Sequence, residues 1–273
     1  AFAALTLDFF VKQKKLVAEF ALLVIVLALC LAKIPAKPMS LFFGMFELDT
    51  FTYFFRAIAL TATGITLLLA MSYTPLRNRY EGEFYGLFLF MAFALTTVAA
   101  ANNLLMIFLA VEFVSLLSYL LVGFLKNDAK SKEAAIKYLL FGSVCSAVML
   151  YGTSLVYGAT GSLELKVIGN ALFYAPLKPL AVTAVLFFFV GLGFKISMAP
   201  FHMWAPDVYE GAPTPVTAFL TVAPKALGFA VLTRVLDLAF WPIKDVWSPM
   251  LVVLSILTMT IGNITAVSQS NIK

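Results

Sequence analysis

The sequence predicts an all-α integral membrane protein, a multi-span helical bundle with one discontinuous helix, and three observations lead to this prediction. First, the 273 residues are 62% hydrophobic and 12% charged, with a mean hydropathy of +0.99, whereas soluble domains average roughly 45–50% apolar and about 25% charged. Second, the apolar residues form long, nearly uncharged runs of helical length, not the ~10-residue alternating segments of a β-barrel. Third, four prolines between Ala199 and Pro215 exclude a continuous helix there.

Taken in order, the chain opens with Ala1–Val11, which we interpret as the stub of a first membrane helix, ended by Lys12, Lys14 and Lys15. Most of the later apolar runs reach the ~20 residues that a bilayer core requires. The chain begins without methionine and shows no cleavable signal pattern, which is consistent with a trimmed or partly ordered chain. Eight complete spans are predicted: Leu16–Ile34, Phe51–Tyr73, Phe84–Ala101, Leu104–Phe124, Ala134–Gly158, Leu180–Trp204, Thr214–Phe240 and Trp247–Ser268.

The basic residues between the spans predict an orientation. Alternating the loops places eight basic residues on one side and four on the other. By the positive-inside rule the richer side is cytoplasmic and the N-terminus lies outside. Because the net charge of +5 comes from such short juxtamembrane clusters, nucleic acid is not an expected partner. The richer set is Lys12, Lys14, Lys15, Arg77, Arg79, Lys126, Lys130 and Lys132; the other is Lys33, Lys37, Lys166 and Lys178.

Three ionisable residues lie too deep in the predicted spans to reach water easily: Glu112, Lys195 and Lys225. An ammonium at bilayer depth costs ~2.5–3.5 kcal/mol on insertion scales, so it is rare without a function. The helical period places two of these charges on polar stripes that we expect to face the bundle interior. The stripes are Glu112, Ser115 and Tyr119, and Thr217, Thr221 and Lys225.

The expected chemistry of these groups is proton relay. Burial disfavours a charged lysine and a nearby carboxylate favours it, so a lysine between the two influences can change its charge state. Glu112 is the one deep acid available to pair with Lys195 or Lys225; the alternative is a static buried ion pair that fixes helix register. The single histidine, His202, suits proton transfer, and an equally good interpretation is a capping or packing group at the helix break.

Other polar residues in or near the spans are interpreted as structural. Charges near span ends, such as Lys137 and Arg234, can reach the interface by snorkelling or pair locally. Gly142 and Ser146, four residues apart on one face, suit close helix packing. Since no CxxC pair or phosphate-binding glycine loop is present, we expect no metal, iron–sulfur or nucleotide site in this chain.

The segment PFHMWAPDVYEGAPTPVTAFLTVAPKALGFA at 200–230 resembles the signature of the antiporter-like membrane subunits of respiratory complex I, the proton-pumping NADH:quinone oxidoreductase. It is most similar to the N-type subunit, and VEFVSLLSYLLVGF and KEAAIKYLLFGS fit the same pattern. The resemblance extends from about Phe51 to Lys273. It implies that Glu112, Lys195 and Lys225 are the family's proton-transfer residues, with His202 at the position of the family histidine.

The resemblance also implies a pair of inverted five-helix repeats. Residues 1–83 would form peripheral helices, 84–240 the first repeat with a proton half-channel, and 241–273 the start of the second repeat. The family's later exit lysine has no counterpart before Lys273. A bacterial inner-membrane location is implied, with other membrane subunits of the complex, including further antiporter-like subunits, as partners. NAD, FMN, iron–sulfur clusters and quinone are expected in other subunits.

Two other classes of function remain open at this point. A subunit of an Mrp-type sodium/proton antiporter, or of a related membrane-bound hydrogenase or photosynthetic complex, would carry the same lysines. A purely architectural membrane subunit would keep proton pumping intact when Lys225 is replaced by alanine.

Overall fold

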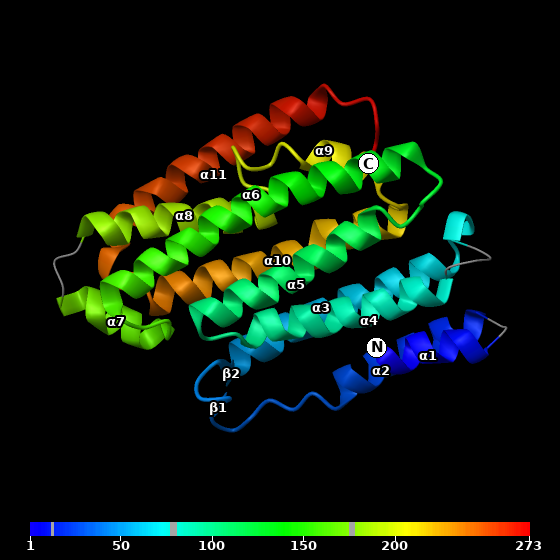
Figure 1. Cartoon of the computed structure of the whole chain (residues 1–273), viewed down its shortest axis with the longest axis horizontal. Helices are drawn as coiled ribbons and strands as arrows, with labels where there is room; N and C mark the ends of the chain where they lie inside the picture. Colours follow the sequence, from blue (N-terminus) through cyan, green and yellow to red (C-terminus); the bar gives the residue numbers. More distant parts are fainter. Residues whose placement is uncertain (12–13, 77–80, 175–177) are drawn as a thin grey trace.

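The computed structural model describes residues 1–11, 14–76, 81–174 and 178–273, so the predicted loop residues Lys12, Arg77 and Arg79 lie outside the described residues. Within these ranges eleven α-helices lie side by side, most of them along one common direction (Figure 1). The helices are α1 (Phe2–Phe10), α2 (Lys14–Cys30), α3 (Thr50–Met71), α4 (Glu81–Ala100), α5 (Leu104–Val122), α6 (Ala129–Thr160), α7 (Leu165–Tyr174), α8 (Lys178–Ile196), α9 (Ala205–Gly211), α10 (Thr214–Leu238) and α11 (Lys244–Val267).

The predicted helical bundle is confirmed, and the spans agree with the structure to within a few residues in most cases. In the described part of the chain, seven helices are long and apolar enough to cross a membrane: α3, α4, α5, α6, α8, α10 and α11. The predicted span Leu16–Ile34 corresponds to α2, which at 17 residues is at the short end of the range for a spanning helix. The N-terminal stub is the nine-residue α1.

Two short strands before α3 were not predicted from the sequence. Strands β1 (Met39–Leu41) and β2 (Phe46–Leu48) form an antiparallel hairpin before α3, at the same end of the bundle as α7 (Figure 1). The hairpin is also bridged to the end of α4 through Phe46 and Ala101. Short elements of this kind leave no long periodic pattern in the sequence, so hydropathy and helical period do not predict them.

The discontinuous helix is confirmed, but the predicted span Leu180–Trp204 is too long, since α8 ends at Ile196. Ser197 has a φ of +58°, the left-handed conformation that commonly ends helices. The N–H of Met198 then donates to the carbonyl of Gly193 (2.7 Å), and the N–H of Ser197 to that of Phe194 (3.2 Å). These two bonds form a Schellman motif, so the helix closes its own last carbonyls before the prolines begin.

Helices α8 and α9 lie one after the other along the 32-residue α6, which spans their combined length (Figure 1). Close contacts at three glycines show which part of α6 meets α8 and which part meets α9. Gly152 of α6 packs against the middle of α8, and Gly142 against Phe194 near its end. Gly211 of α9 packs against the first turns of α6. The interruption after Ile196 therefore faces the middle of a continuous helix, as expected of irregular backbone at membrane depth.

Helices α10 and α11 follow the interruption. Pro224 lies inside α10 without ending it, because proline is tolerated within membrane helices. Helix α11 packs at the edge of the bundle with most of its apolar surface exposed, and Trp247 is its one fully buried residue. Thr258 of α11 accepts a hydrogen bond from the N–H of Ala199 (3.0 Å) and so reaches the interrupted segment.

Candidate functional site

Lys195 is buried at the end of α8, where its side chain meets α5. The residue is 4% exposed, and its Nζ donates a hydrogen bond to Ser115 Oγ at 2.8 Å. Ser115 in turn donates to the carbonyl of Val111 (2.9 Å). Lys195 also lies in the last turn of its helix, where the partial negative charge of the helix C-terminus stabilises a cation by ~0.3–1 kcal/mol. The buried ammonium is thus held by a hydroxyl and by a helix end.

Glu112 is half-buried on α5, one turn before Ser115, and faces α6. Its carboxylate accepts a short hydrogen bond from Ser146 Oγ of α6. Ser146 was interpreted from the sequence as a packing residue, and the structure adds a polar contact to that role. Gly142, one turn away, does pack closely, because a Cβ there would overlap the Tyr119 hydroxyl. A small residue and a donor at this spacing bring α6 onto the polar stripe of α5.

The expected direct pairing of Glu112 with a lysine is not observed. Among the described residues, no ion pair of 4.0 Å or less joins Glu112 to Lys195 or Lys225. Each charge instead has a serine hydroxyl as its hydrogen-bond partner: Lys195 bonds Ser115, one turn after Glu112 on α5, and Glu112 bonds Ser146 of α6.

Lys225 lies on α10, is half-buried and faces Tyr209 of α9. Its Nζ is 5.3 Å from the centre of the Tyr209 ring, a cation–π distance. Thr217, on the same predicted stripe, is buried and donates to the carbonyl of Tyr209 (3.0 Å). Thr221 departs from the prediction, because it is exposed and donates to Ala218 of its own helix (2.8 Å), which satisfies its hydroxyl without burial.

An aromatic cluster fills the space between the ends of α8, α5 and α9. Tyr138 of α6 lies at its centre and stacks on Trp204 with 4.4 Å between ring centroids. Tyr119 packs edge-on against Tyr138 (4.8 Å), and Tyr209 against Trp204 (5.7 Å). Trp204 Nε1 also donates to the carbonyl of Phe194 (3.2 Å). The cluster therefore connects the residue preceding Lys195 to the ring beneath Lys225.

His202 lies in the connector between α8 and α9 and is half-buried. In the described residues its Nδ1 is buried without a hydrogen-bond partner, as are Ser197 Oγ, Tyr119 Oη and Tyr209 Oη. No hydrogen bond or ion pair joins His202 to Glu112, Lys195 or Lys225 in the described part of the chain. Buried polar atoms normally bind protein groups or water. Several such atoms without a partner lie in or near the connector, beside the aromatic cluster.

The charged residues of the α9 segment pair with the beginning of α6. Asp207 accepts from Lys137 at 2.5 Å, and Glu210 from Lys130 at 2.7 Å. They line a cavity of about 130 Å³. Lys137 also pairs with Glu133, four residues earlier, as expected for a charge near a span end. These pairs fix α9 to α6 at the surface.

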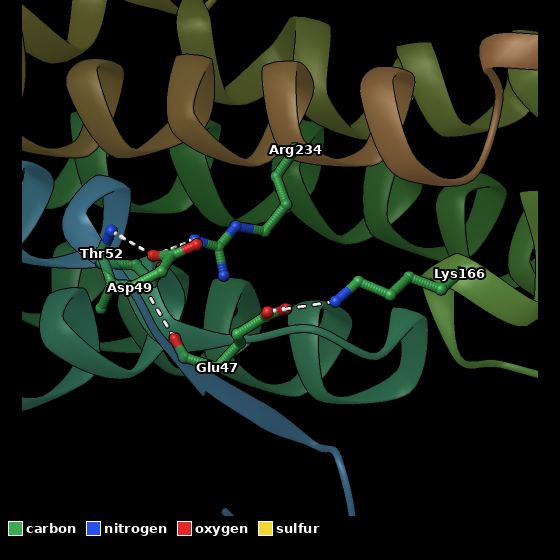
Figure 2. A network of polar contacts seen from close by, with 6 residues as sticks. Glu47, Asp49, Thr52, Lys166 and Arg234 are labelled. Carbon is green, nitrogen blue, oxygen red and sulfur yellow. Dashed lines mark hydrogen bonds and ion pairs between the residues drawn. The ribbon is translucent and has the colours of Figure 1, made fainter. Parts of the chain in front are cut away.

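A second polar network lies at the opposite end of the bundle (Figure 2). Arg234 of α10, whose side chain is 5% exposed, donates to both carboxylate oxygens of Asp49 (2.9 and 3.0 Å) and to Thr52 Oγ1 (3.1 Å). Asp49 caps α3 by accepting from the N–H of Thr52 (2.7 Å). Nearby, Lys166 pairs with Glu47 at 3.1 Å. The expectation that Arg234 snorkels or pairs locally was wrong: it is buried, and its partner is 185 residues away in sequence.

The model of a transmembrane family described as NADH:quinone oxidoreductase/Mrp antiporter matches residues 101–273, which include α5 to α11. The chain belongs to this family. The match contains Glu112, Lys195, His202 and Lys225.

Curated relatives of the chain include quinone oxidoreductase subunits. NADH-quinone oxidoreductase subunit N 1 of Solibacter usitatus is 41% identical over 233 residues, which are 85% of this chain and 48% of that protein. NAD(P)H-quinone oxidoreductase subunit 2 of Thermosynechococcus vestitus is 46% identical over 234 residues, 85% of this chain and 45% of that protein. The chain thus spans about half the length of the curated relatives it matches.

Solved structures give the same fold. A chain of respiratory complex I from Thermus thermophilus with bound aureothin superposes with a TM-score of 0.80 at 36% identity, covering 98% of this chain and 56% of that one. A chain of an archaeal membrane-bound sulfane sulfur reductase matches with the same TM-score at 21% identity, covering 99% and 58%. At that identity the second likeness shows the fold alone.

Three features of the site were missed from the sequence. Ser146 was seen only as a small residue, Tyr209 was not singled out, and the partner of Arg234 was not found. The contacts of Ser146 and Arg234 join elements that are distant in sequence, whereas Tyr209 lies on the helix directly before that of Lys225. The one local signal was the spacing of Ser146 four residues after Gly142, which indicated that this face of α6 meets another helix.

Proposed function

We propose that the chain belongs to a proton-translocating membrane subunit of an NADH:quinone oxidoreductase (complex I), in which quinone reduction elsewhere in the complex drives protons through Glu112, Lys195 and Lys225. The observation that carries this proposal is Lys195, an ammonium 4% exposed in a membrane helix that stops within the bundle. Its nearest partner is a neutral hydroxyl on the helix that carries Glu112. A purely structural lysine would normally be paired with a carboxylate at this depth.

The geometry favours a lysine at position 195 whose charge state can change. Ser115 Oγ accepts from Lys195 without neutralising it, and Ser146 holds the Glu112 carboxylate on the other side. A small approach of Glu112 towards Lys195 strengthens their attraction and stabilises the ammonium, and a small separation weakens it. A lysine in that position takes up and releases a proton as the distance changes. We propose that Lys225 receives the released proton and that His202 assists in the connector.

The wider assignments rest on the relatives. We propose that residues 84–240 form the first antiporter-like repeat, with 1–83 peripheral to it and 241–273 beginning the second. The basic loops would face the cytoplasm of a bacterial inner membrane, with the N-terminus outside. The partners would be other membrane subunits, including further antiporter-like ones, while NAD, FMN, iron–sulfur clusters and quinone would be held by other subunits. This chain would contribute the pumping part of the enzyme and carry no redox site.

The test is redox-driven proton pumping by the whole complex in vesicles. Glu112→Ala and Lys225→Ala should each lower pumping while the complex still assembles, because each removes a relay group. Lys244→Ala is the matched control, since Lys244 is an exposed lysine of α11. Normal pumping in both relay variants would reject the proposal and would favour an architectural subunit.

A second candidate function is favoured by the family itself, whose description names the Mrp antiporter beside NADH:quinone oxidoreductase. In an antiporter, sodium–proton exchange would proceed without quinone reduction. Exchange by the full-length protein in vesicles that contain no electron-input subunits would support this second function. The electron-input proteins that co-purify would separate complex I from a related hydrogenase or photosynthetic complex.

A further inference from the structure

We propose that Tyr209 is a positioning residue for Lys225, and that its aromatic face is the group that holds the Lys225 ammonium in place. This inference rests on the proposed function, because it gives a role in relay to the surroundings of Lys225. It starts from the cation–π contact of 5.3 Å between Lys225 Nζ and the Tyr209 ring.

The ring is the one partner found for this charge. In the described part of the chain, no hydrogen bond and no ion pair of Lys225 Nζ is present. A carboxylate partner would hold the ammonium tightly and would be costly to separate from it. An aromatic face attracts a cation more weakly, and its attraction favours the bound position by a factor of about two to thirty. Tyr209 therefore fixes where the charge sits and leaves it able to lose its proton.

The position of the ring is itself fixed by one contact to the Tyr209 backbone and one contact to the ring. Thr217, two turns before Lys225 on α10, donates to the Tyr209 carbonyl at 3.0 Å. Trp204 packs edge-on against the ring and donates to the carbonyl of Phe194 at 3.2 Å. Phe194 directly precedes Lys195. The pair formed by Trp204 and Tyr209 therefore connects the end of α8 at Lys195 to Lys225 on α10. A shift of the α8 end would move Trp204, and with it the ring beneath Lys225.

The surface ion pairs reinforce this arrangement. Asp207 and Glu210 flank Tyr209 on α9 and pair with Lys137 and Lys130 of α6. Exposed pairs of this kind contribute little to stability one by one. They nevertheless hold a seven-residue helix in one orientation, and that orientation directs Tyr209 towards Lys225.

The experiment is a fluorination series at Tyr209 in the whole complex, with redox-driven proton pumping in vesicles as the measurement. Tyr209→Phe should retain pumping to within about twofold, since it keeps the ring. Replacing Tyr209 by phenylalanines with one, two and three ring fluorines should then lower pumping stepwise. Fluorine withdraws electron density from the face and changes the size of the ring little. Tyr209→Leu should lower pumping at least as far as the most fluorinated ring.

The control is the same series at Phe88, a fully buried residue whose ring packs against Phe219. Pumping should not depend on fluorination there. Equal pumping across the Tyr209 series, together with a loss in Lys225→Ala, would overturn the role of Tyr209 and leave the proposed function standing. Normal pumping in Lys225→Ala would overturn the role of Tyr209, and normal pumping in Glu112→Ala as well would overturn the proposed function. If Tyr209→Leu does not assemble, the fluorinated series still decides the question.

Discussion

The ion pair between Asp49 and Arg234 allows the sharpest prediction about stability, because its two partners differ in burial. The Arg234 side chain is 5% exposed and that of Asp49 is 27% exposed. Arg234 Nη1 is already buried without a partner. Asp49 has a second set of bonds, since it accepts from the N–H of Thr52 as the cap of α3. Removing the Asp49 carboxylate therefore leaves a more deeply buried unpaired charge than removing the Arg234 guanidinium does.

The expected magnitudes follow from this asymmetry. Asp49→Asn keeps an oxygen for the helix cap and leaves a buried guanidinium without a counter-charge, which costs ~3–5 kcal/mol. Arg234→Met leaves Asp49 with its cap bond and partial access to water, so the cost is that of charged hydrogen bonds, ~1.5–3 kcal/mol. The double variant should be more stable than the sum of the single changes predicts, because it contains no buried unpaired charge.

The assay is SDS- or heat-induced unfolding of the purified full-length protein, followed by tryptophan fluorescence. The order of stability should be wild type, then Arg234→Met, then Asp49→Asn. Additive effects, or an Asp49→Asn variant as stable as the wild type, would refute the reasoning, because either result means that the buried pair makes no net contribution.

The same pair predicts a dependence on pH. Burial raises the pKa of Asp49, but the hydrogen bonds from Thr52 and the charge and hydrogen bond of Arg234 outweigh it, so the pKa lies below its ordinary value. A carboxyl whose pKa is lower in the folded state stabilises the fold above its unfolded pKa of about 3.9 and loses that contribution as the pH falls through the folded value. The stability difference between wild type and Asp49→Asn should therefore shrink below about pH 4.

Two further predictions concern α6. Ser146→Ala should slow redox-driven pumping roughly tenfold, because it removes a charge-assisted hydrogen bond to Glu112, whereas Ser143→Ala, at an exposed serine of the same helix, should have no effect. Gly142→Ala should lower the unfolding midpoint by the equivalent of ~1–3 kcal/mol, because a Cβ there would overlap the tyrosine packed on it. Gly158→Ala is its control in the unfolding assay, since a Cβ at Gly158 meets no atom within 4 Å, and an equal loss in both variants would contradict the packing argument.

Much of the fold could be predicted from the sequence because membrane helices obey a strong constraint. Long apolar runs must be helical in lipid, so the positions of α3, α4, α5 and α10 followed from hydropathy to within a few residues. Boundaries were least accurate where local geometry decides them. Hydropathy continues to Trp204, but α8 stops at Ile196 because Ser197 turns left-handed and closes the helix.

The candidate site was predictable in part for a similar reason. Glu112, Lys195 and Lys225 stood out because charges at bilayer depth are costly. Their partners did not, because the contacts cross between different helices, and hydropathy and helical period do not show which helices meet. The sequence suggested that opposite charges would meet directly, whereas a serine on the same helix as Glu112 takes the bond from Lys195. The interpretation of Arg234 was wrong because it rested on the position of the residue near the end of its span. That position carries no information about the distant partner, Asp49.

The partners of the charges differ with their position in the fold, and the difference bears on mechanism. In the described residues, carboxylates pair directly with Arg234, Lys166 and Lys130 at the ends of the bundle. The two lysines of the candidate site instead meet a hydroxyl and an aromatic ring. A direct ion pair in a low-dielectric interior is costly to separate, so it holds helices together but resists any change of charge. Neutral partners position an ammonium without that resistance, and a charge that must come and go with each proton needs partners of this second kind.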